Sequence, residues 1–336
     1  MTDETDTFLV ALYTIVDDLY RTYAAPLKPS RPGQDPELSD SEVITLAILQ
    51  QASGKAEGAF LTFVRAYWSA YFPRLLERTA FNRRVRDLCG VMMHLTPHLA
   101  RELGAETAVY QALDTVPVPL MRRGRGDRHR TFGCEASIGR GGPDKEWYYG
   151  CKLLLSVTDD GVITGFTLAP AETDDRWAAE AFLCWRSDAQ GLPWQTSDLP
   201  ASHKAGGKRR GPTGPIWGRS SAGVAPSVPY IADLGFAGYV WGCHWLWDYQ
   251  ALVLTKDSYD NETARALKRE LCSWRQVVET VNGQLVDVFH LHFPGARSIW
   301  GLLTRLAAKV LAVNIGEQIN RLWGRPAFAL ATIFNC

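Results

Sequence analysis

The chain has 336 residues, of which 46% are hydrophobic and 21% are charged, and its formal net charge at pH 7 is zero. A chain of this length and composition can bury a full hydrophobic core, which excludes an intrinsically disordered protein and predicts one large or two smaller globular domains. Zero net charge excludes an overall basic field, so any contact with nucleic acid has to depend on local basic segments.

Compartment signals are weak and point to the cytoplasm. The sequence contains no long uninterrupted apolar segment, and its start, MTDETDTF, is acidic where a secretory signal would be basic. Seven cysteines are scattered without a CxxC pair, which indicates reduced thiols and not a disulfide framework. His290 and His292 near Cys272 are too few ligands for a zinc site, so ordinary packing is the favoured interpretation. We expect a cytoplasmic protein with no membrane contact.

Residues 1–100 predict an all-helical N-terminal domain. Apolar residues recur at helical spacing over residues 8–23, and a proline-rich connector follows. Ser39 and Glu42 have the S-x-x-E spacing of a capping box ahead of an apolar run, which marks the start of a helix. Further helical patterns cover residues 60–68, 73–77 and 81–93.

The last of these patterns carries three arginines that we expect to be exposed, Arg83, Arg84 and Arg86. They are able to meet DNA phosphates, which would make this domain a DNA-end recognition domain. They are equally compatible with solvated charges on a helical cap. Residues 1–42 hold nine acidic and three basic residues, a local net charge of −6 that repels a DNA backbone. Both interpretations stay open.

From residue 108 the pattern changes from helices to strands. Residues 108–115, AVYQALDT, predict a short strand buried on both faces, with Asp114 at the point where the strand ends. Residues 228–236, VPYIADLGF, have the same form, with Asp233 after an apolar run and before Gly235. A carboxylate in either position is able to face a cleft.

A third acid, Glu279, lies in the helical pattern WRQVVETVNGQLV, four residues after Arg275 on the same face. Taken singly, each aspartate has the setting of a cap or turn residue, and Glu279 has the setting of a solvated helix charge. Together, two strand-end aspartates and a helical glutamate on separate rigid elements predict an oxygen cage for a pair of hard divalent cations.

Between the first two acids lies a basic segment followed by a hairpin. Residues 121–130 hold five arginines and one aspartate, and this composition suits either a flexible clamp on a nucleic-acid backbone or a plain surface loop. Residues 145–170 predict a β-hairpin, because Asp160 and Gly161 form a tight-turn pair between two apolar runs.

Asp174 and Asp175 come next, and we expect them to cap and begin a helix over residues 176–185, although as neighbouring acids they are rivals to the three above. Residues 187–228 are rich in Gly, Pro and Ser and are interpreted as a long insertion. Trp217 within it could stack on a base or anchor the loop to the surface.

The C-terminal part of the chain returns to helices. An aromatic helix is expected over residues 238–249, and longer helices are expected to begin at Glu262 and near Ser298. Residues 265–336 hold nine basic and four acidic residues, a net charge of +5 that suits contact with DNA. On the last helix three basic residues are expected to point outward: Arg305, Lys309 and Arg321.

Five segments of the chain resemble bacterial insertion-sequence transposases of the DDE type and occur in that family's order. They are ALDTVPVP around Asp114, WYYGCKLLLSVTDDGVITGFTLAPAETDD over residues 147–175, IADLGF around Asp233, RQVVETVNGQL around Glu279, and ARSIWGLLTRLAAKVLA over residues 296–312. Together they cover most of residues 105–325.

The resemblance implies an α/β, ribonuclease H-like catalytic domain over residues 101–325, with a mixed sheet flanked by helices. The helical domain of residues 1–100 precedes it and a tail of residues 326–336 follows. In this family the matching acids are catalytic, so Asp114, Asp233 and Glu279 are expected to bind two Mg²⁺ ions, which Mn²⁺ can replace.

The implied reaction is cleavage of DNA at the ends of an insertion sequence, followed by transfer of the cut strand to target DNA, by a homodimer assembled on DNA. Five basic residues are the expected DNA contacts: Arg122, Arg123, Arg125, Lys152 and Arg275.

Two departures from the family matter, because Leu234 and Val286 stand where similar sequences carry basic residues. Losing two phosphate contacts would weaken DNA binding without removing the metal cage. Two alternatives therefore stay open beside the transposase. One is an inactive or domesticated descendant that binds DNA, and the other is a metal-dependent nuclease of the same fold.

Overall fold

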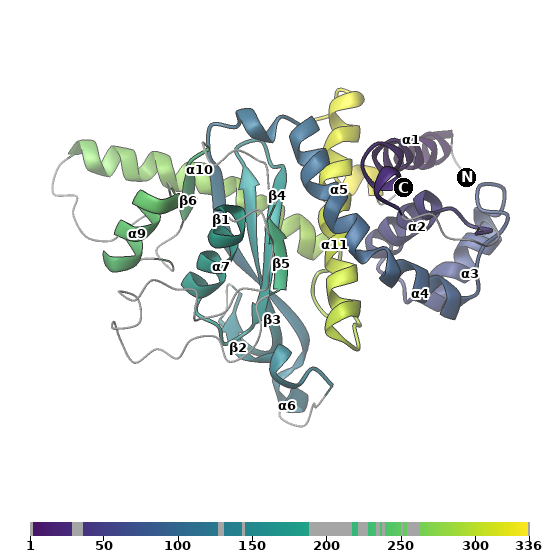
Figure 1. Cartoon of the computed structure of the whole chain (residues 1–336), viewed down its shortest axis with the longest axis horizontal. Coiled ribbons are helices and arrows are strands. Elements are labelled where there is room, and N and C mark those ends of the chain that lie inside the picture. Colours follow the sequence, from purple (N-terminus) through teal and green to yellow (C-terminus); the bar gives the residue numbers. More distant parts are fainter. Residues whose placement is uncertain are drawn as a thin grey trace. The chain divides into compact units, whose positions relative to one another are not determined.

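The computed structural model of the chain describes residues 3–28, 36–126, 131–142, 145–187, 217–220, 228–232, 236, 239–249, 251–253 and 262–334. The chain divides into two compact units (Figure 1). Unit 1 combines Met1–Leu99 with Gln284–Cys336, and unit 2 is Ala100–Gly283.

Unit 2 is built on a mixed β-sheet. Its strands are β1 Gln111–Arg122, β2 Ser137–Gly141, β3 Glu146–Thr158, β4 Ile163–Pro170, β5 Trp217–Ser220, β6 Tyr230–Ala232 and β7 Ala251–Val253. Among the described residues their order is β5-β4-β3-β1-β6-β7, with β2 paired to β3 beside β4. The pairs β1–β3, β3–β4 and β4–β5 are antiparallel, whereas β6 runs parallel to β1 and β7 runs parallel to β6.

The predicted hairpin is confirmed by the antiparallel pairing of β3 with β4. The backbone N–H of Gly161 donates to the carbonyl of Thr158 at 3.0 Å, and Gly161 adopts φ 89°, a conformation that glycine enters without steric cost. The interpretation of residues 187–228 as an insertion needs correction at one place, because residues 217–220 form the strand β5 on the edge of β4. The rest of that segment up to residue 227 lies outside the described residues.

Strand β1 is longer than the sequence predicts. It continues to Arg122, so Asp114 is not at the end of the strand but is its fourth residue. The two prolines in ALDTVPVP are compatible with this length, because β1 pairs with β6 only over Gln111–Leu113. Beyond those residues β1 has only β3 as a described neighbour, and a proline on an open strand edge removes no ladder hydrogen bond.

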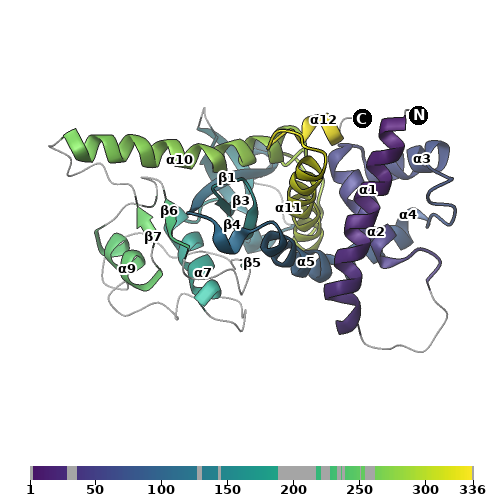
Figure 2. The same ribbon diagram turned by 90° about the horizontal axis from the view of Figure 1, so that it is seen from above.

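Helices cover both faces of this sheet. They are α7 Asp175–Ser187, α9 Tyr239–Tyr249 and α10 Glu262–Asp287, with the single turn α6 Arg123–Gly126 after β1. Helix α10 lies along one face and α7 lies on the other (Figure 2). Phe182 of α7 and Trp245 of α9 are fully buried in one cluster with residues of β1, β3, β6 and β7. Unit 2 is therefore a mixed α/β structure with a helix-flanked sheet.

Unit 1 is helical. Its elements are α1 Asp3–Leu19, a π-helical turn Tyr20–Ala24, a 3₁₀ turn Ala25–Leu27, α2 Asp40–Ala52, α3 Glu57–Tyr67, α4 Arg78–Asp87, α5 Cys89–Glu102, α11 Ile299–Leu322 and α12 Ala331–Phe334. The predicted capping box is confirmed, since the Ser39 hydroxyl accepts from the Glu42 N–H and the Glu42 carboxylate accepts from the Ser39 N–H. The prediction of a helix over residues 73–77 is wrong, because these residues form a turn and an irregular link.

Helix α11 is the central element of unit 1. The sequence places it in the catalytic domain, but its contacts group it with α1, α2 and α4. It is apolar on nearly every side, and Lys309, expected to point outward, is only 2% exposed. By length and composition α11 could cross a membrane, yet 83% of its apolar 18-residue stretch is buried within the structure, as in the core helix of a folded domain.

The expected C-terminal tail also differs from the structure. Helix α12 buries Phe334 against α1 and against Phe289.

We predict that Gly150→Ala destabilises unit 2 by about 1–3 kcal/mol, the usual cost of overpacking. A Cβ atom on Gly150 would lie 2.2 Å from the carbonyl oxygen of Val118, a backbone atom of β1 that cannot rotate away. Urea unfolding measures the change. Gly242→Ala is the control, because it lies in α9 with open space around it and should be neutral or slightly stabilising. Equal stability of wild type and Gly150→Ala would contradict the strand register described here.

Candidate functional site

The side chain of Asp114 reaches from β1 to helix α10. The amide nitrogen of Asn282 donates a hydrogen bond to the Asp114 carboxylate at 3.1 Å, between residues 168 positions apart in the sequence. Asn282 is 9% exposed and Asp114 is half-buried. This contact joins the central strand of the sheet to the helix that carries the third candidate acid.

Glu279 lies one helical turn before Asn282, on the same side of α10. It forms an ion pair with Arg275 at 3.7 Å, and its side chain is 60% exposed while that of Arg275 is 11% exposed. The arginine is therefore the anchored partner and the carboxylate is the accessible one. Glu279 therefore lies one turn of α10 away from the residue that contacts Asp114.

A second contact fixes α10 against the start of β1. The rings of Tyr110 and Trp274 are stacked, with centroids 4.9 Å apart and planes 6° from parallel. The Tyr110 hydroxyl also donates to the carbonyl oxygen of Trp274 at 3.0 Å. Stacking and hydrogen bonding together limit sliding of the helix along the strand, so the spacing between Asp114 and α10 is well determined.

Asp233 and Leu234 lie outside the described residues. The residue before them, Ala232, is in parallel register with Leu113, the residue before Asp114. The pairing begins at Gln111 and Tyr230, each three residues before its aspartate. The two candidate aspartates therefore follow equivalent positions of neighbouring parallel strands.

The oxygen atoms on this side of unit 2 fit a hard cation in their chemistry. Besides the two carboxylates, the amide oxygen of Asn282 is buried without a hydrogen-bond partner in the structure, and it is a neutral ligand of the kind that Mg²⁺ and Mn²⁺ accept. Within the described ranges, no group of three or more His, Cys, Asp or Glu residues is arranged to hold a metal ion. Asp233 lies outside these ranges.

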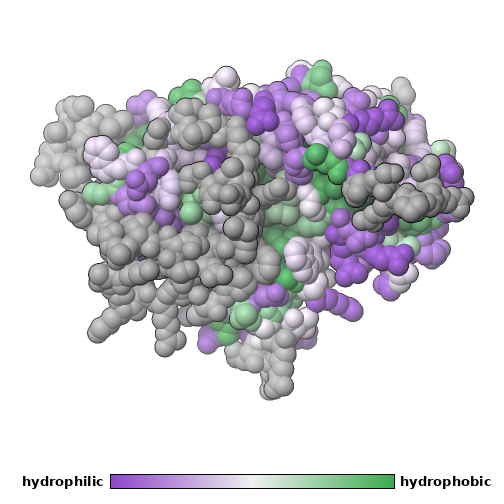
Figure 3. All heavy atoms as spheres, in the orientation of Figure 1, coloured by the Kyte–Doolittle hydropathy of each residue, from purple (hydrophilic) through white to green (hydrophobic). Residues whose placement is uncertain are grey.

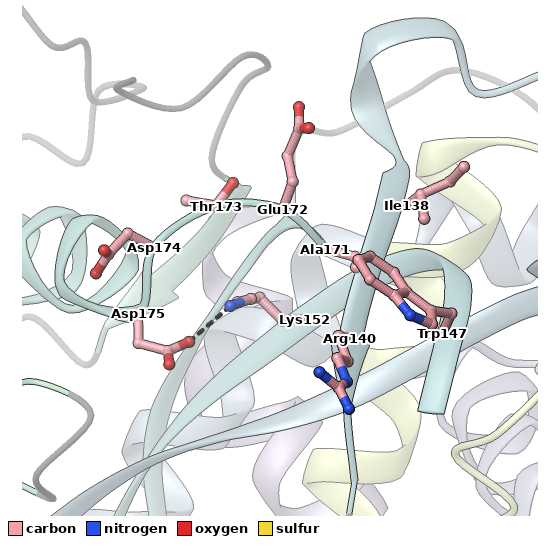
Figure 4. Close-up of a pocket in the computed structure, with 10 residues that line it drawn as sticks. Ile138, Arg140, Trp147, Lys152, Ala171, Glu172, Thr173, Asp174 and Asp175 are labelled. Carbon is pink, nitrogen blue, oxygen red and sulfur yellow. Dashed lines mark hydrogen bonds and ion pairs between the residues drawn. The ribbon is translucent and has the colours of Figure 1, made fainter. Parts of the chain in front are cut away.

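Lys152, a candidate DNA contact, lies on the other face of the sheet. Successive residues of a strand face opposite sides, so Asp114 meets α10 while the Thr115 hydroxyl donates to Asp175 of α7 at 3.1 Å. Lys152 pairs in register with Pro117 and forms an ion pair with the same Asp175 at 2.7 Å (Figure 4). The positive charge of Lys152 is thus already paired with the Asp175 carboxylate.

The pocket around this ion pair has a volume of about 350 Å³ and is lined by residues that include Arg140, Trp147, Glu172 and Asp174. Asp174 precedes α7, and its carboxylate accepts from the backbone N–H of Arg176 at 3.1 Å and from its guanidinium at 2.9 Å. Asp174 and Asp175 therefore cap and begin α7, as predicted, and both already have cationic partners. The helix begins at Asp175, one residue earlier than expected.

The structure describes residues 121–126 of the predicted basic segment. Arg122 ends β1, and Arg123 and Arg125 belong to the turn α6, with all three exposed. The Arg123 guanidinium lies over the Trp147 ring, 5.0 Å from its centroid, and such a contact holds the side chain while leaving its charge accessible. Residues 127–130 lie outside the described residues.

Of the three N-terminal arginines expected to be exposed, Arg83 and Arg86 are exposed.

Arg84 differs from the expectation, because it is half-buried and internally paired. It forms an ion pair with Asp40 at 2.6 Å, and the same carboxylate also pairs with Lys28 at 2.7 Å. These partners hold the pKa of Asp40 below its usual value even though burial alone would raise it. Arg84 is thus a structural residue of unit 1.

A buried carboxylate that the sequence did not single out links α7 to α9. Glu180 is 2% exposed and accepts hydrogen bonds from Trp245 Nε1 at 2.6 Å, Tyr249 Oη at 3.1 Å and His244 Nε2 at 2.9 Å. The imidazole also contacts Asp248. The hydrogen bond to Glu180 raises the pKa of His244 above its ordinary value, against the opposing effect of burial. This network holds α9, the helix that follows the Asp233 segment in the chain.

Searches of protein-family models, curated proteins and solved structures find no match to this chain.

We predict that the stability supplied by His244 depends on pH. Because its folded pKa is raised, the protonated imidazole contributes fully below about pH 6.5, and the contribution is lost as the pH rises through the folded pKa. His244→Gln should therefore cost about 1–3 kcal/mol near pH 6 and less near pH 9, as measured by urea unfolding. A loss that is the same at both pH values would show that the ion pair with Glu180 does not form.

Proposed function

We propose that the protein is a DDE-type transposase, which cuts DNA at the ends of an insertion sequence and joins the cut strand to target DNA in the cytoplasm. The observation that carries this proposal is the hydrogen bond between Asn282 and Asp114, because it ties α10 to β1 one helical turn from Glu279. A site shared by Asp114 on β1 and Glu279 on α10 would then rest on two rigid elements, as the chemistry requires.

The sheet supports a ribonuclease H-like fold for unit 2. Strand β1 is followed by the β3–β4 hairpin, the arrangement that this fold requires after its first strand, and the parallel strands β6 and β7 extend the sheet from the other edge of β1. The parallel register of β1 with β6 supports Asp233 as the second acid, since Asp114 and Asp233 follow paired positions by the same number of residues.

Asp114, Asp233 and Glu279 are the proposed ligands of two Mg²⁺ ions. When bound, these ions would lower the pKa of the attacking water or DNA 3′-hydroxyl and would stabilise the negative charge on the leaving oxygen. Asn282 orients the Asp114 carboxylate by its hydrogen bond, and Arg275 positions the Glu279 side chain. In each step one P–O bond forms as another breaks, so cleavage and joining use the same residues.

DNA is the proposed partner, bound by a homodimer. Arg122, Arg123 and Arg125 are exposed at the end of β1 and are the proposed backbone contacts, with Arg275 beside the candidate acids. Lys152 is a weaker candidate, because its ion pair with Asp175 would have to open before it could meet a phosphate.

An inactive DNA-binding descendant is the second candidate. The observation that favours it is the small number of accessible cations near Asp114: Lys152 faces α7, Arg275 is largely buried, and Val286 and Leu234 replace basic residues of the family. A nuclease of the same fold would keep the acids but release nicked DNA without joined products.

We predict that Asp114→Ala and Glu279→Gln each lower Mg²⁺-dependent DNA cleavage about 1,000-fold, because each removes a metal ligand worth several kcal/mol of transition-state stabilisation. The assay is gel analysis of a labelled duplex that carries the sequences flanking the gene. Glu146→Gln, an exposed carboxylate of the same unit, is the control. Full cleavage by Asp114→Ala would exclude the assigned site, and nicks without joined products would favour the nuclease.

We also predict that Asn282→Ala weakens Mn²⁺ binding by about 10- to 100-fold, the usual effect of losing a group that orients a metal ligand. Isothermal titration of the full chain with Mn²⁺ measures the change, and it does not require a known DNA sequence. Thr115→Ala is the control, because Thr115 neighbours Asp114 but contacts α7. Identical Mn²⁺ affinity in Asn282→Ala and wild type would show that Asn282 does not orient a metal ligand.

A further inference from the structure

Unit 1 contains a cavity of about 680 Å³ whose lining is strongly basic. It lies among α2, α4, the first half of α11 and the segment of residues 290–298. Figure 3 shows hydrophilic side chains over the region of α4. The lining includes six Lys and Arg residues, Lys55, Arg78, Arg86, Arg297, Arg305 and Lys309. Its one carboxylate is Glu57, which already accepts a hydrogen bond from Asn82 at 2.7 Å.

Two of these cations come from one face of α11, where Lys309 is 2% exposed and Arg305 is half-buried. Among the described residues the Lys309 ammonium donates to the carbonyl oxygen of Phe289. Arg305, one turn earlier, forms no ion pair or hydrogen bond in the described part of the chain. Burial, together with the nearby charge of Arg305, lowers the pKa of Lys309 to about 7, and burial also lowers the pKa of Arg305, while Glu57 opposes that effect.

Buried cations without a carboxylate partner destabilise a folded protein. Replacing a buried ionic group by a hydrophobic residue of similar volume is often neutral or stabilising, so the burial of Lys309 is not explained by stability. The cations of this lining come from four separate parts of the chain, which are the link between α2 and α3, α4, residues 290–298 and α11. An anion that enters the cavity would be met from several sides and would restore the charge balance.

The rim of the cavity adds an aromatic surface. Phe293 is 53% exposed, and both it and His290 adopt positive φ values, 52° and 51°, which are strained for residues other than glycine. The His290 ring packs on Gly54, where a Cβ atom would lie only 2.6 Å from Nε2. Strain of this kind persists where the surrounding structure enforces it, and it is frequent at ligand-binding sites.

We propose that this cavity binds a nucleotide, with its phosphate at Arg305 and Lys309 and its base against the ring of Phe293. A volume of about 680 Å³ is within the range of small-ligand sites, and an exposed aromatic ring accepts any base by stacking. The phosphate belongs either to a free nucleotide or to the terminal nucleotide of a DNA strand. All residues of the site belong to unit 1, so the proposal does not depend on the metal chemistry assigned to unit 2.

The test is isothermal titration of the full chain with deoxyadenosine 5′-monophosphate, with inorganic phosphate, with deoxyadenosine and with a short 5′-phosphorylated single strand. We expect the monophosphate to bind at least about tenfold more tightly than deoxyadenosine, because a charge-assisted contact is lost with the phosphate. Tighter binding of the phosphorylated strand than of the mononucleotide identifies a DNA end as the ligand. The reverse order identifies a free nucleotide.

Arg305→Met and Lys309→Met should each weaken binding of the monophosphate at least about tenfold. Arg297→Ala tests the same contact with an exposed residue, so its effect cannot come from misfolding. Phe293→Ala should weaken binding of the monophosphate while leaving that of inorganic phosphate unchanged. Arg83→Ala is the control, since Arg83 lies on α4 outside the cavity.

The proposal is overturned if neither the monophosphate nor the phosphorylated strand binds the wild-type chain, or if deoxyadenosine binds as tightly as its phosphate. Undiminished binding by folded Arg305→Met and Lys309→Met would overturn it as well. Asp114→Ala should bind the monophosphate like wild type, which separates a failure of this site from a failure of the proposed transposase activity.

Discussion

The contact between Asp114 and Asn282 is the interaction on which the proposed metal site depends. It spans 3.1 Å between the fourth residue of β1 and the buried face of α10. Glu279 lies one helical turn from this contact, 60% exposed and paired with Arg275. Stacking of Tyr110 on Trp274 supports the same docking one helical turn or more away. The acidic site is therefore a consequence of how a long helix is held against the sheet.

Alternation along the sheet then sorts the polar residues of unit 2 by function. Asp114 faces α10, and the next residue, Thr115, faces α7, where Lys152 and Asp175 neutralise one another. The acids near the start of α7 are thereby used in local structure, while Glu279 on α10 is 60% exposed. In unit 1 positive charge is in excess. Helix α11 contributes two cations to the cavity lining, which has a single carboxylate.

Local sequence signals were the most reliable guide to this structure. The capping box at Ser39 and the turn at Gly161 were predicted correctly because each depends on residues a few positions apart. Lys309 was placed on the wrong side of its helix, because periodicity assigns polar residues to solvent and cannot recognise a helix buried on nearly every side. Asn282 was missed, since its importance comes only from a partner 168 residues away. The strand-end and helical settings of the three acids only made them candidates, and their catalytic role stays a prediction from family resemblance.

The most direct test of the site is a crystal structure of the protein grown with Mn²⁺, with the metal located by anomalous scattering. The account predicts a metal peak within about 2.5 Å of carboxylate oxygens of Asp114 and Glu279, with Asp233 completing the site. A peak at Asp174 and Asp175 instead, or a fully loaded crystal in which the Asp114 and Glu279 carboxylates contact no metal, would contradict it.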